Sequence, residues 1–230
     1  MRGIYPEDKT LFTGEELLKL KKAAKTLYYL LEENYNKKPS INFICNRFLF
    51  PERQRVVLSR AILKPEELSI IREREVKDFS TIKEVSIDGF NAIILFESIM
   101  CKAPVLKCND GVFRDMANLR GKYKILDETS LSIKLILGWL DSKNIEKATI
   151  YLDEPVSNSR NLKRLILEIS KDYKVDLTVD LRFDVDKTLY EQENVISGDS
   201  VVLMNSKSWT NMYADIIKDI NDLWIIDFLL

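Results

Sequence analysis

The chain has 230 residues, of which 46% are hydrophobic, and it carries 35 Lys and Arg against 36 Asp and Glu with no histidine. This length and composition suit one large or two small folded domains and exclude a disordered or collagen-like chain. Without histidine, the chain has no Ser-His-Asp or Cys-His nucleophile system, no histidine-ligated zinc and no histidine general base.

The first third of the sequence predicts helices. Thr13–Glu16 has the spacing of a capping box, and apolar residues then recur at helical spacing. A short segment over Ile41–Phe48 and a basic helix that begins at Pro51 follow, joined by a tight turn, which is typical of a helix-turn-helix. The second helix carries Arg53, Gln54, Arg55 and Arg60. These residues either contact nucleic acid or face water on a helical cap.

A highly charged stretch over residues 63–83 separates this region from the rest. We place the domain boundary there, with a helical N-terminal domain over residues 1–78 and an α/β domain over residues 79–230. Residues 1–84 carry 17 Lys and Arg against 13 Asp and Glu, whereas residues 85–230 carry 18 against 23. A basic N-terminal part and an acidic C-terminal part are typical of a binding module joined to a carboxylate site.

The remaining sequence alternates short apolar strands with helices, which predicts an α/β domain with a mainly parallel sheet. The expected strands are Val85–Asp88, Val105–Cys108, Ala148–Asp153, Val175–Val179, Asn194–Ser197 and Leu223–Phe228. The expected helices are Asn91–Met100, Ser130–Lys143, Ser159–Asp172, Lys187–Gln192 and Trp209–Asp219. Ligand sites in such sheets form beyond the carboxyl ends of the strands, so the residues that follow the strands are the candidates.

Aspartates follow three of the predicted strands. Asp88, Asp153 and Asp199 lie at strand ends, and Asp186 opens a later helix. A parallel sheet gathers its strand ends at one edge, and four carboxylates in one pocket repel one another unless a divalent cation neutralises them. Oxygen ligands suit Mg²⁺ or Mn²⁺, and such an ion can activate water for attack on phosphorus. The alternative is that each aspartate only caps the helix that follows it.

Several motifs carry a resemblance to known families. They are Asn46–Phe48 with Arg53–Arg55, Asp88–Asn91, Asn109–Asp115, Leu152–Ser159 and Ser197–Ser200. Over residues 20–205 the chain resembles an uncharacterised archaeal and bacterial family of unknown function, which pairs a helical N-terminal domain with a PIN-like C-terminal domain. The strand-end motifs also resemble those of the wider PIN/NYN-like nuclease superfamily.

The resemblance implies a PIN-like α/β domain that cleaves RNA with the help of a metal ion. The acids that match the family motif are Asp88, Asp153, Asp186 and Asp199. Three of them, Asp88, Asp153 and Asp199, would hold Mg²⁺ or Mn²⁺. The remaining acid, Asp186, matches a family acid at the start of a helix, and Asp180 and Asp184 are alternative candidates for that role.

Polar residues near these acids are candidates for substrate binding. They are Asn91, Arg114, Ser157, Ser159 and Arg160. Asn91 matches the polar residue that follows the first acid in the family. In the acidic loop of residues 109–115, Asp110 and Asp115 flank Arg114. The loop either binds a second metal ion, holds a phosphate with Arg114, or forms a turn with Arg114 in a surface ion pair. Ser157 and Ser159 either bind phosphate at a helix N-terminus or cap that helix.

Two functions follow as hypotheses. The first is a metal-dependent ribonuclease that hydrolyses phosphodiester bonds with an activated water, and the second is a non-catalytic RNA- or protein-binding module on the same fold. The start of the sequence lacks the apolar core of a signal peptide, and no run of 18 apolar residues exists. We therefore expect a cytoplasmic protein without a membrane partner, and RNA and a second copy of the chain are the partners to test.

Overall fold

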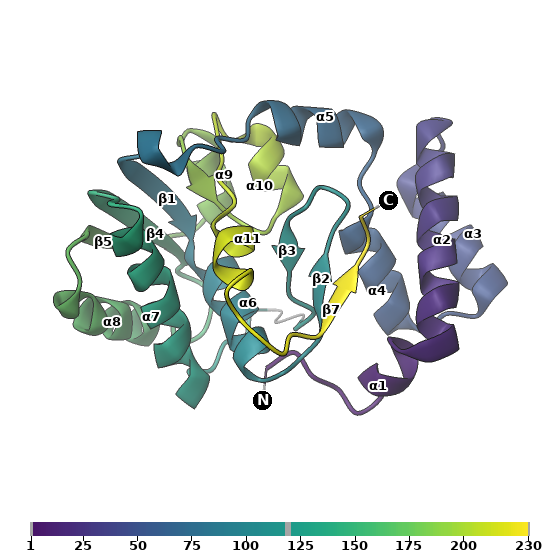
Figure 1. Cartoon of the computed structure of the whole chain (residues 1–230), viewed down its shortest axis with the longest axis horizontal. Coiled ribbons are helices and arrows are strands. Elements are labelled where there is room, and N and C mark those ends of the chain that lie inside the picture. Colours follow the sequence, from purple (N-terminus) through teal and green to yellow (C-terminus); the bar gives the residue numbers. More distant parts are fainter. Residues whose placement is uncertain (1, 118–120, 230) are drawn as a thin grey trace.

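The computed structural model describes residues 2–117 and 121–229 (Figure 1). Its N-terminal part is helical, as expected, and Figure 1 shows α2, α3 and α4 grouped at one end of the molecule. The helices of this part are α1 (Asp8–Leu11), α2 (Gly14–Glu32), α3 (Lys37–Phe48), α4 (Glu52–Ala61) and α5 (Pro65–Glu73). The expected α/β class with a helical N-terminal region is therefore confirmed.

The starts of two helices differ from the expectation. Thr13 precedes α2, but its hydroxyl donates to the carbonyl of Lys9 and accepts no hydrogen bond from the helix, so the predicted capping box is wrong. Helix α3 begins at Lys37 and includes Pro39 in its first turn, where a missing backbone N–H costs no helical hydrogen bond. Leu49, with a left-handed backbone (φ +56°), forms the tight turn before α4.

Two of the residues expected to face nucleic acid or water instead hold the fold together. The guanidinium of Arg53 binds the buried carboxylate of Asp8, with Nε 2.6 Å from Oδ1, and donates to the carbonyl of Met116 at 2.8 Å. Gln54 is buried and donates to the carbonyl of Leu11 at 2.9 Å. The expectation is wrong for these two residues because this face of α4 packs against the N-terminal segment.

The main sheet of the described residues is parallel throughout, which confirms the expected strand direction (Figure 1). Its strands are β1 (Glu84–Asp88), β4 (Lys147–Asp153), β5 (Asp176–Arg182) and β6 (Val195–Ile196), in the order β5-β4-β1-β6. Asp88 pairs with Tyr151, and Asp153 pairs with Arg182. The carboxyl ends of neighbouring strands therefore meet at one edge, which we call the acidic edge.

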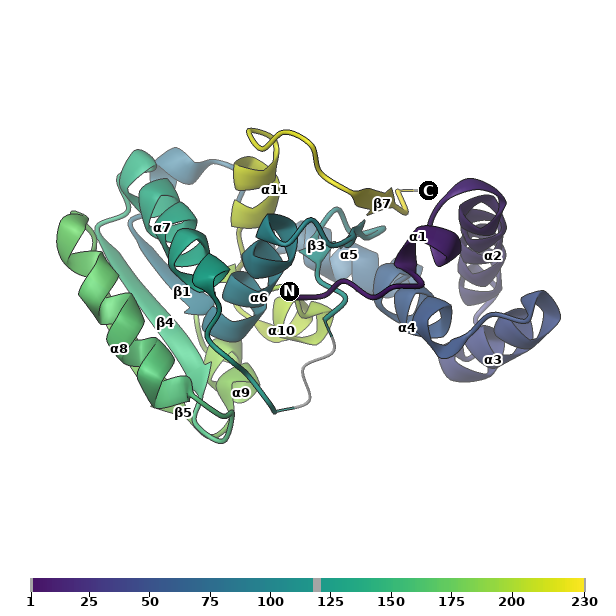
Figure 2. The same ribbon diagram turned by 90° about the horizontal axis from the view of Figure 1, so that it is seen from below.

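The two faces of this sheet differ in character. Apolar side chains such as Ile87 and Ile150 form one face, which is covered by helices α6 (Gly89–Met100), α7 (Asp127–Ser142) and α8 (Ser159–Ile169) (Figure 2). Because side chains alternate along a strand, Ser86 and Asp88 share the opposite face, as do Thr149 and Asp153. That polar face is crossed by the short helix α9 (Val185–Tyr190), which contacts β1 and β4.

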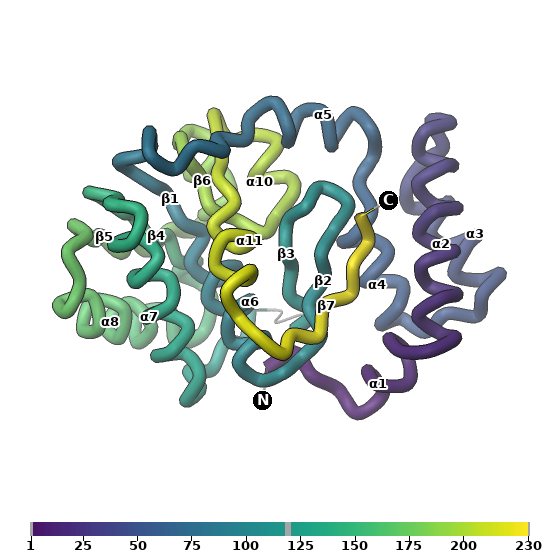
Figure 3. Tube along the Cα trace, in the orientation of Figure 1, coloured from purple at the N-terminus to yellow at the C-terminus, as the bar shows by residue number. Residues whose placement is uncertain are grey.

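A second, smaller sheet lies between the helical part and the main sheet. Its strands are β2 (Val105–Lys107), β3 (Phe113–Arg114) and β7 (Ile225–Asp227), in the order β3-β2-β7. Strand β7 runs parallel to β2 and brings the C-terminal segment beside it (Figure 3). The remaining elements are η1 (Phe79–Thr81), η2 (Ser170–Asp172), α10 (Ser200–Asn205) and α11 (Met212–Ile217).

Two hydrophobic cores stabilise the molecule. The larger joins the main sheet and its helices, and it also includes Leu68 and Ile71 of α5. The smaller joins α2, α3 and α4 to the second sheet through Leu106, Ile226 and Phe228, each at most 1% exposed. Burying a side chain of this size contributes roughly 1.5–3 kcal/mol, so the second sheet stabilises the helical part. The domain boundary at residue 78 stays a prediction.

A buried ion pair fastens the N-terminal segment to α6. Arg2 Nε lies 2.7 Å from Oε2 of Glu97, a side chain with no exposed surface. The hydroxyl of Tyr123 donates to the other carboxylate oxygen at 2.6 Å. The carboxylate of Glu97 is therefore hydrogen-bonded on both oxygens, as a buried charge requires. No helix in residues 2–117 and 121–229 is long and apolar enough to cross a membrane.

Candidate functional site at the acidic edge

The site is built around the junction of β1 and α6. Asp88 ends β1 and caps α6, where its Oδ1 accepts the backbone N–H of Asn91 at 3.2 Å. The side-chain amide of Asn91 donates to Oδ2, and the hydroxyl of Ser197, just after β6, donates to the same atom at 2.9 Å. Residues that follow the neighbouring strands β1 and β6 thus orient the carboxylate of Asp88, a residue that is only 3% exposed.

Gly89 allows α6 to begin this close to the sheet. A Cβ atom at position 89 would lie 2.6 Å from side-chain atoms of both Ile150 and Leu152. Glycine has no such atom, so the first turn of α6 packs directly on β4. The position of the Asp88 carboxylate therefore depends on the residue that follows it.

The environment of Asp88 changes its acidity. Burial raises the pKa of Asp88 to about 7, and the negative charge of Asp153 also raises it, while the hydrogen bonds from Asn91 and Ser197 act in the opposite direction. The carboxyl group is therefore neutral and ionised in comparable amounts near neutral pH. A carboxyl group with this property, held beside a second carboxylate, is typical of functional sites.

The other predicted acids bring negative charge to the same edge. Burial raises the pKa of Asp153, and the charge of Asp184 raises it further. Desolvation raises the pKa of Asp186, and the charges of Asp199 and Asp153 add to this effect. The structure thus brings all four predicted acids close enough for their charges to interact.

Two of these aspartates also cap helices, as the alternative interpretation predicts. Asp88 caps α6, and Asp199 caps α10 by accepting the backbone N–H two residues later at 2.7 Å. Asp184 caps α9, so Asp186 lies inside the first turn of that helix. Asp153 and Asp186 cap none of the described helices. Capping therefore accounts for two of the four predicted acids.

The donor atoms at this edge can be compared with the needs of a divalent cation. Within the described residues, no three Asp, Glu or Cys side chains are close enough together to hold one ion. Mg²⁺ usually binds one or two carboxylates and completes its shell with water and substrate phosphates. Asp88 and Asp153 are two carboxylates of this edge whose charges interact, which matches that number of ligands. The three-residue set Asp88, Asp153 and Asp199 stays a prediction.

A pocket of about 140 Å³ opens beside Asn91 at the acidic edge. Its lining residues are Ser59, Arg60, Asn91, Arg114, Asp115, Gly198, Asp199 and Ser200. Ser59 and Arg60 belong to α4, whereas the others come from the second part of the chain. Of the residues predicted from the sequence, Asn91, Arg114 and Asp199 therefore meet in one pocket, and helix α4 closes one side of it.

Arg114 fixes one wall of this pocket. The residue is 7% exposed, and its guanidinium donates two hydrogen bonds to the carboxylate of Asp110 and a third to the carbonyl of Gly198. The predicted alternative of an ion pair is confirmed, although the pair is buried and not on the surface. Arg114 thereby holds the loop that carries Asp199, and its role as a phosphate ligand stays a prediction.

The remaining substrate-binding candidates do not line this pocket. The hydroxyl of Ser157 bonds to the backbone N–H and carbonyl of Tyr123 at 2.8 and 2.9 Å. Ser159 is buried and donates to the carbonyl of Glu154, whose carboxylate pairs with the exposed Arg160 at 3.0 Å. The N-cap of α8 is Asn158, without a side-chain cap hydrogen bond, so the alternative that Ser157 or Ser159 caps this helix is wrong. The role of all three residues in substrate binding stays a prediction.

Sequence reasoning missed three residues around Asp88. Ser197 and Asp115 lie in the motifs Ser197–Ser200 and Asn109–Asp115 but were not predicted to lie near Asp88, and nothing in the local sequence singles out Tyr213. The Tyr213 hydroxyl is buried without a hydrogen-bond partner among the described residues. Burial raises the pKa of Tyr213 strongly, and the charges of Asp88 and Asp115 add to it. A buried hydroxyl without a partner costs about 1–3 kcal/mol, and such groups call for a functional explanation.

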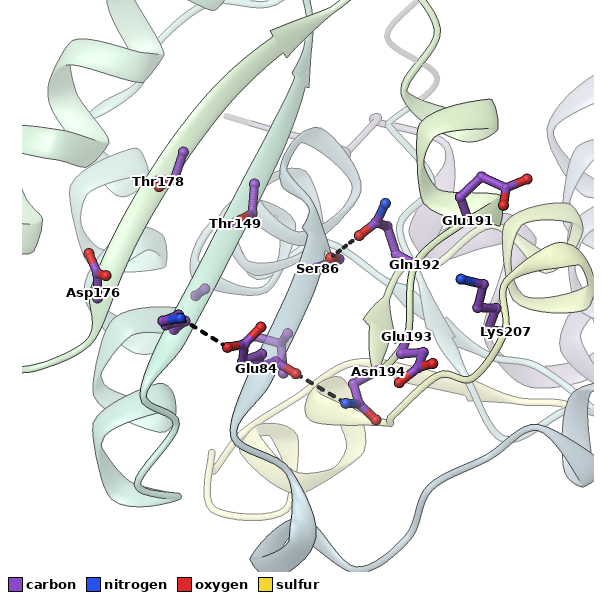
Figure 4. A pocket seen from close by; sticks show the side chains of 13 residues that line it. Glu84, Ser86, Thr149, Asp176, Thr178, Glu191, Gln192, Glu193, Asn194 and Lys207 are labelled. Carbon is purple, nitrogen blue, oxygen red and sulfur yellow. Dashed lines mark hydrogen bonds and ion pairs between the residues drawn. The ribbon is translucent and has the colours of Figure 1, made fainter.

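A second polar pocket, of about 380 Å³, opens on the polar face near the amino ends of the strands (Figure 4). Ser86 bonds to Gln192 there, and Glu84 lies 3.2 Å from Lys147. Of the charged side chains that line this pocket, Glu84 and Lys147 form an ion pair with each other. Ligands of parallel sheets bind beyond the carboxyl ends of the strands, so we assign the candidate site to the acidic edge.

The fold and the site define a mixed α/β protein with a helical N-terminal region and an acidic sheet edge. The chain belongs to the family described as a domain of unknown function, DUF5616, which matches residues 78–215, and residues 19–74 match a protein of unknown function, DUF434. It is 31% identical over 205 residues to the uncharacterised protein MJ0935 of Methanocaldococcus jannaschii, covering 87% of this chain and 98% of that relative. No solved structure matches. The expected resemblance to an uncharacterised family is confirmed.

Proposed function

We propose that the protein is a metal-dependent ribonuclease with a PIN/NYN-like catalytic domain. The observation that carries the proposal is the buried carboxyl of Asp88, which has a pKa of about 7 and interacts with the charge of Asp153. Asp186 and Asp199 add negative charge at the same edge. Carboxylates held together against their repulsion favour a positively charged ligand.

The residues of the acidic edge would have different roles in this reaction. Mg²⁺ or Mn²⁺, held by Asp88 and Asp153, would supply positive charge for the phosphate and lower the pKa of water. Asn91 and Ser197 orient Asp88 by donating to its Oδ2. Asp186 lies at the exposed rim of the edge with a raised pKa, which suits its carboxylate to accept a proton from the attacking water.

The non-catalytic alternative has its own support in the structure. Asp88 and Asp199 cap helices, so both have a structural role without any chemistry. In that case the fold binds RNA or a protein partner, and removal of the carboxylate charge changes its function little. The two proposals therefore differ in what replacement of these acids does.

Cleavage of a labelled single-stranded RNA in the presence of Mn²⁺ or EDTA tests the proposal. We expect the wild type to cleave only with Mn²⁺, Asp88→Asn and Asp153→Asn to be inactive, and Asp186→Asn to be slower by about 100-fold, as loss of a proton acceptor usually causes. Asp78→Asn is the matched control, because the side chain of Asp78 caps η1 as that of Asp88 caps α6, but Asp78 precedes β1 and lies outside the acidic edge. Cleavage by Asp88→Asn at the wild-type rate would refute the proposal.

A further inference from the structure

A basic groove of about 580 Å³ lies between α3 and α4. Its lining residues are Lys37, Lys38, Ile41, Asn42, Glu52, Arg55, Val56, Ser59 and Arg60. Four of these side chains are positive and only Glu52 is negative, in a chain whose net charge is −1. The groove is therefore a local concentration of positive charge on a nearly neutral protein.

Most of this positive charge is not compensated. Lys37, Lys38 and Arg55 form no ion pair within the described residues, and Arg55 donates to the neutral side chain of Asn46 at 2.7 Å. Burial lowers the pKa of Lys37, whereas the negative charge of Glu67 raises it and the positive charge of Arg114 lowers it to a smaller extent. The unpaired charge of the groove therefore comes chiefly from Lys38 and Arg55, to which a bound anion would supply the missing partner.

The groove continues into the pocket at the acidic edge, because Ser59 and Arg60 line both. Arg60 donates to the carbonyl of Asp115 at 2.8 Å, and its side chain is still 40% exposed. A guanidinium has five N–H donors, so others are free to bind a ligand. The far wall of the pocket carries Asn91 and Asp199. A ligand in the groove thus reaches the acidic edge along one continuous surface.

The shape and chemistry of the groove favour one kind of ligand. The basic α4 is not available as a recognition helix for duplex DNA, because Arg53 and Gln54 are engaged inside the protein. A recess between two helices takes a single extended chain. None of the lining residues is aromatic, so the groove recognises a charged backbone and not stacked bases.

We propose that the groove between α3 and α4 binds the sugar-phosphate backbone of a single nucleic-acid strand and leads it to the acidic edge. This inference rests on the proposed function of that edge as a ribonuclease. Lys38, Arg55 and Arg60 contact successive phosphates, and the neutral donors of Asn42 and Ser59 add hydrogen bonds to the backbone. The helical region is then the part of the enzyme that selects single strands.

Fluorescence anisotropy with a labelled RNA strand tests the groove without requiring cleavage, since EDTA is present throughout. Three phosphate contacts predict that log Kd rises with log salt concentration with a slope of about 2.1, and Lys38→Gln/Arg55→Gln should lower this slope to about 0.7. The control Lys163→Gln/Arg164→Gln removes the same charge from α8 and should keep the wild-type slope. Circular dichroism checks that each variant is folded.

The outcomes separate this inference from the proposed function. Binding that depends on the groove, without cleavage by the wild type in Mn²⁺, supports the groove and refutes the ribonuclease. If the groove variant keeps the wild-type slope of log Kd against log salt concentration and still cleaves RNA, the proposed role of the groove is refuted and the proposed ribonuclease activity is supported. Equal binding of RNA and DNA strands supports recognition of backbone phosphates. Displacement of RNA by poly-glutamate at equal concentration would overturn the inference in favour of an acidic peptide.

Discussion

Relative to the wild type, replacement of Asp88 by Asn should favour the stability of the metal-free protein more at alkaline pH than at acidic pH. The side chain is buried, and its pKa in the folded state is about 7 against an ordinary value of 3.8. Because the folded pKa is raised, the folded state prefers the protonated form. The energetic cost of ionising Asp88 is absent below about pH 4, grows as the pH rises toward 7 and is complete above that value.

The magnitude follows from the shift in pKa. A difference of about three units, at 1.36 kcal/mol for each unit, gives about 4 kcal/mol as an upper limit. Asn is as good an N-cap as Asp, so the start of α6 loses little. Its NH2 group cannot accept the hydrogen bonds that Asn91 and Ser197 donate to Oδ2 of Asp88, which reduces the stability of the variant. Relative to the wild type, Asp88→Asn should therefore gain up to about 4 kcal/mol of stability between pH 4.5 and pH 8.5 in urea titrations.

Asp184→Asn provides the matched control in the same urea titrations in EDTA. Hydrogen bonds to Lys187 lower the pKa of Asp184, so its carboxylate stabilises the fold above the ordinary pKa of an aspartate. Removing it should destabilise the protein slightly at pH 8.5, which is the opposite sign. Equal stability of Asp88→Asn and the wild type at both pH values would refute the reasoning, because it would mean that burial does not penalise the charge of Asp88.

Three further predictions concern the site and its supports. Titration of Mn²⁺ followed by calorimetry should show saturable binding to the wild type and none to Asp88→Asn; equal heats would refute the metal site. Gly89→Ala should destabilise the protein by about 1–3 kcal/mol in urea titrations, because the new Cβ meets Ile150, and an unchanged midpoint would contradict the close packing. Glu97→Gln should cost about 3–5 kcal/mol by leaving Arg2 buried without its partner, and Arg2→Met/Glu97→Gln should recover part of that loss.

The strand-end acids were predictable because each depends on local pattern and on one rule of sheet geometry. The alternation of strands and helices predicted parallel strands, and parallel strands end at one edge. Asp88, Asp153 and Asp199 therefore follow from the sequence. Asp186 was also predicted, as the acid that opens a later helix, and α9 carries it across the polar face to that same edge.

Contacts between distant segments were not predictable in this way. Arg53 and Arg60 lie on the same basic helix, yet Arg53 binds Asp8 inside the protein and Arg60 lines the pocket at the acidic edge. Tyr213 reaches the site from α11 with no local signal. Very short strands such as β7 carry too few residues to specify a partner, and β7 joins β2 in the second sheet and not the main one.

The placement of β7 has a consequence for the order in which the parts of the protein can fold during synthesis. Helices α2, α3 and α4 are synthesised before the main sheet, but Ile226 and Phe228, which complete their core, are synthesised after it. Until then the growing chain presents an apolar surface that its own later residues must cover. The groove between α3 and α4 thus gains its full support only after the residues of the acidic edge have been synthesised.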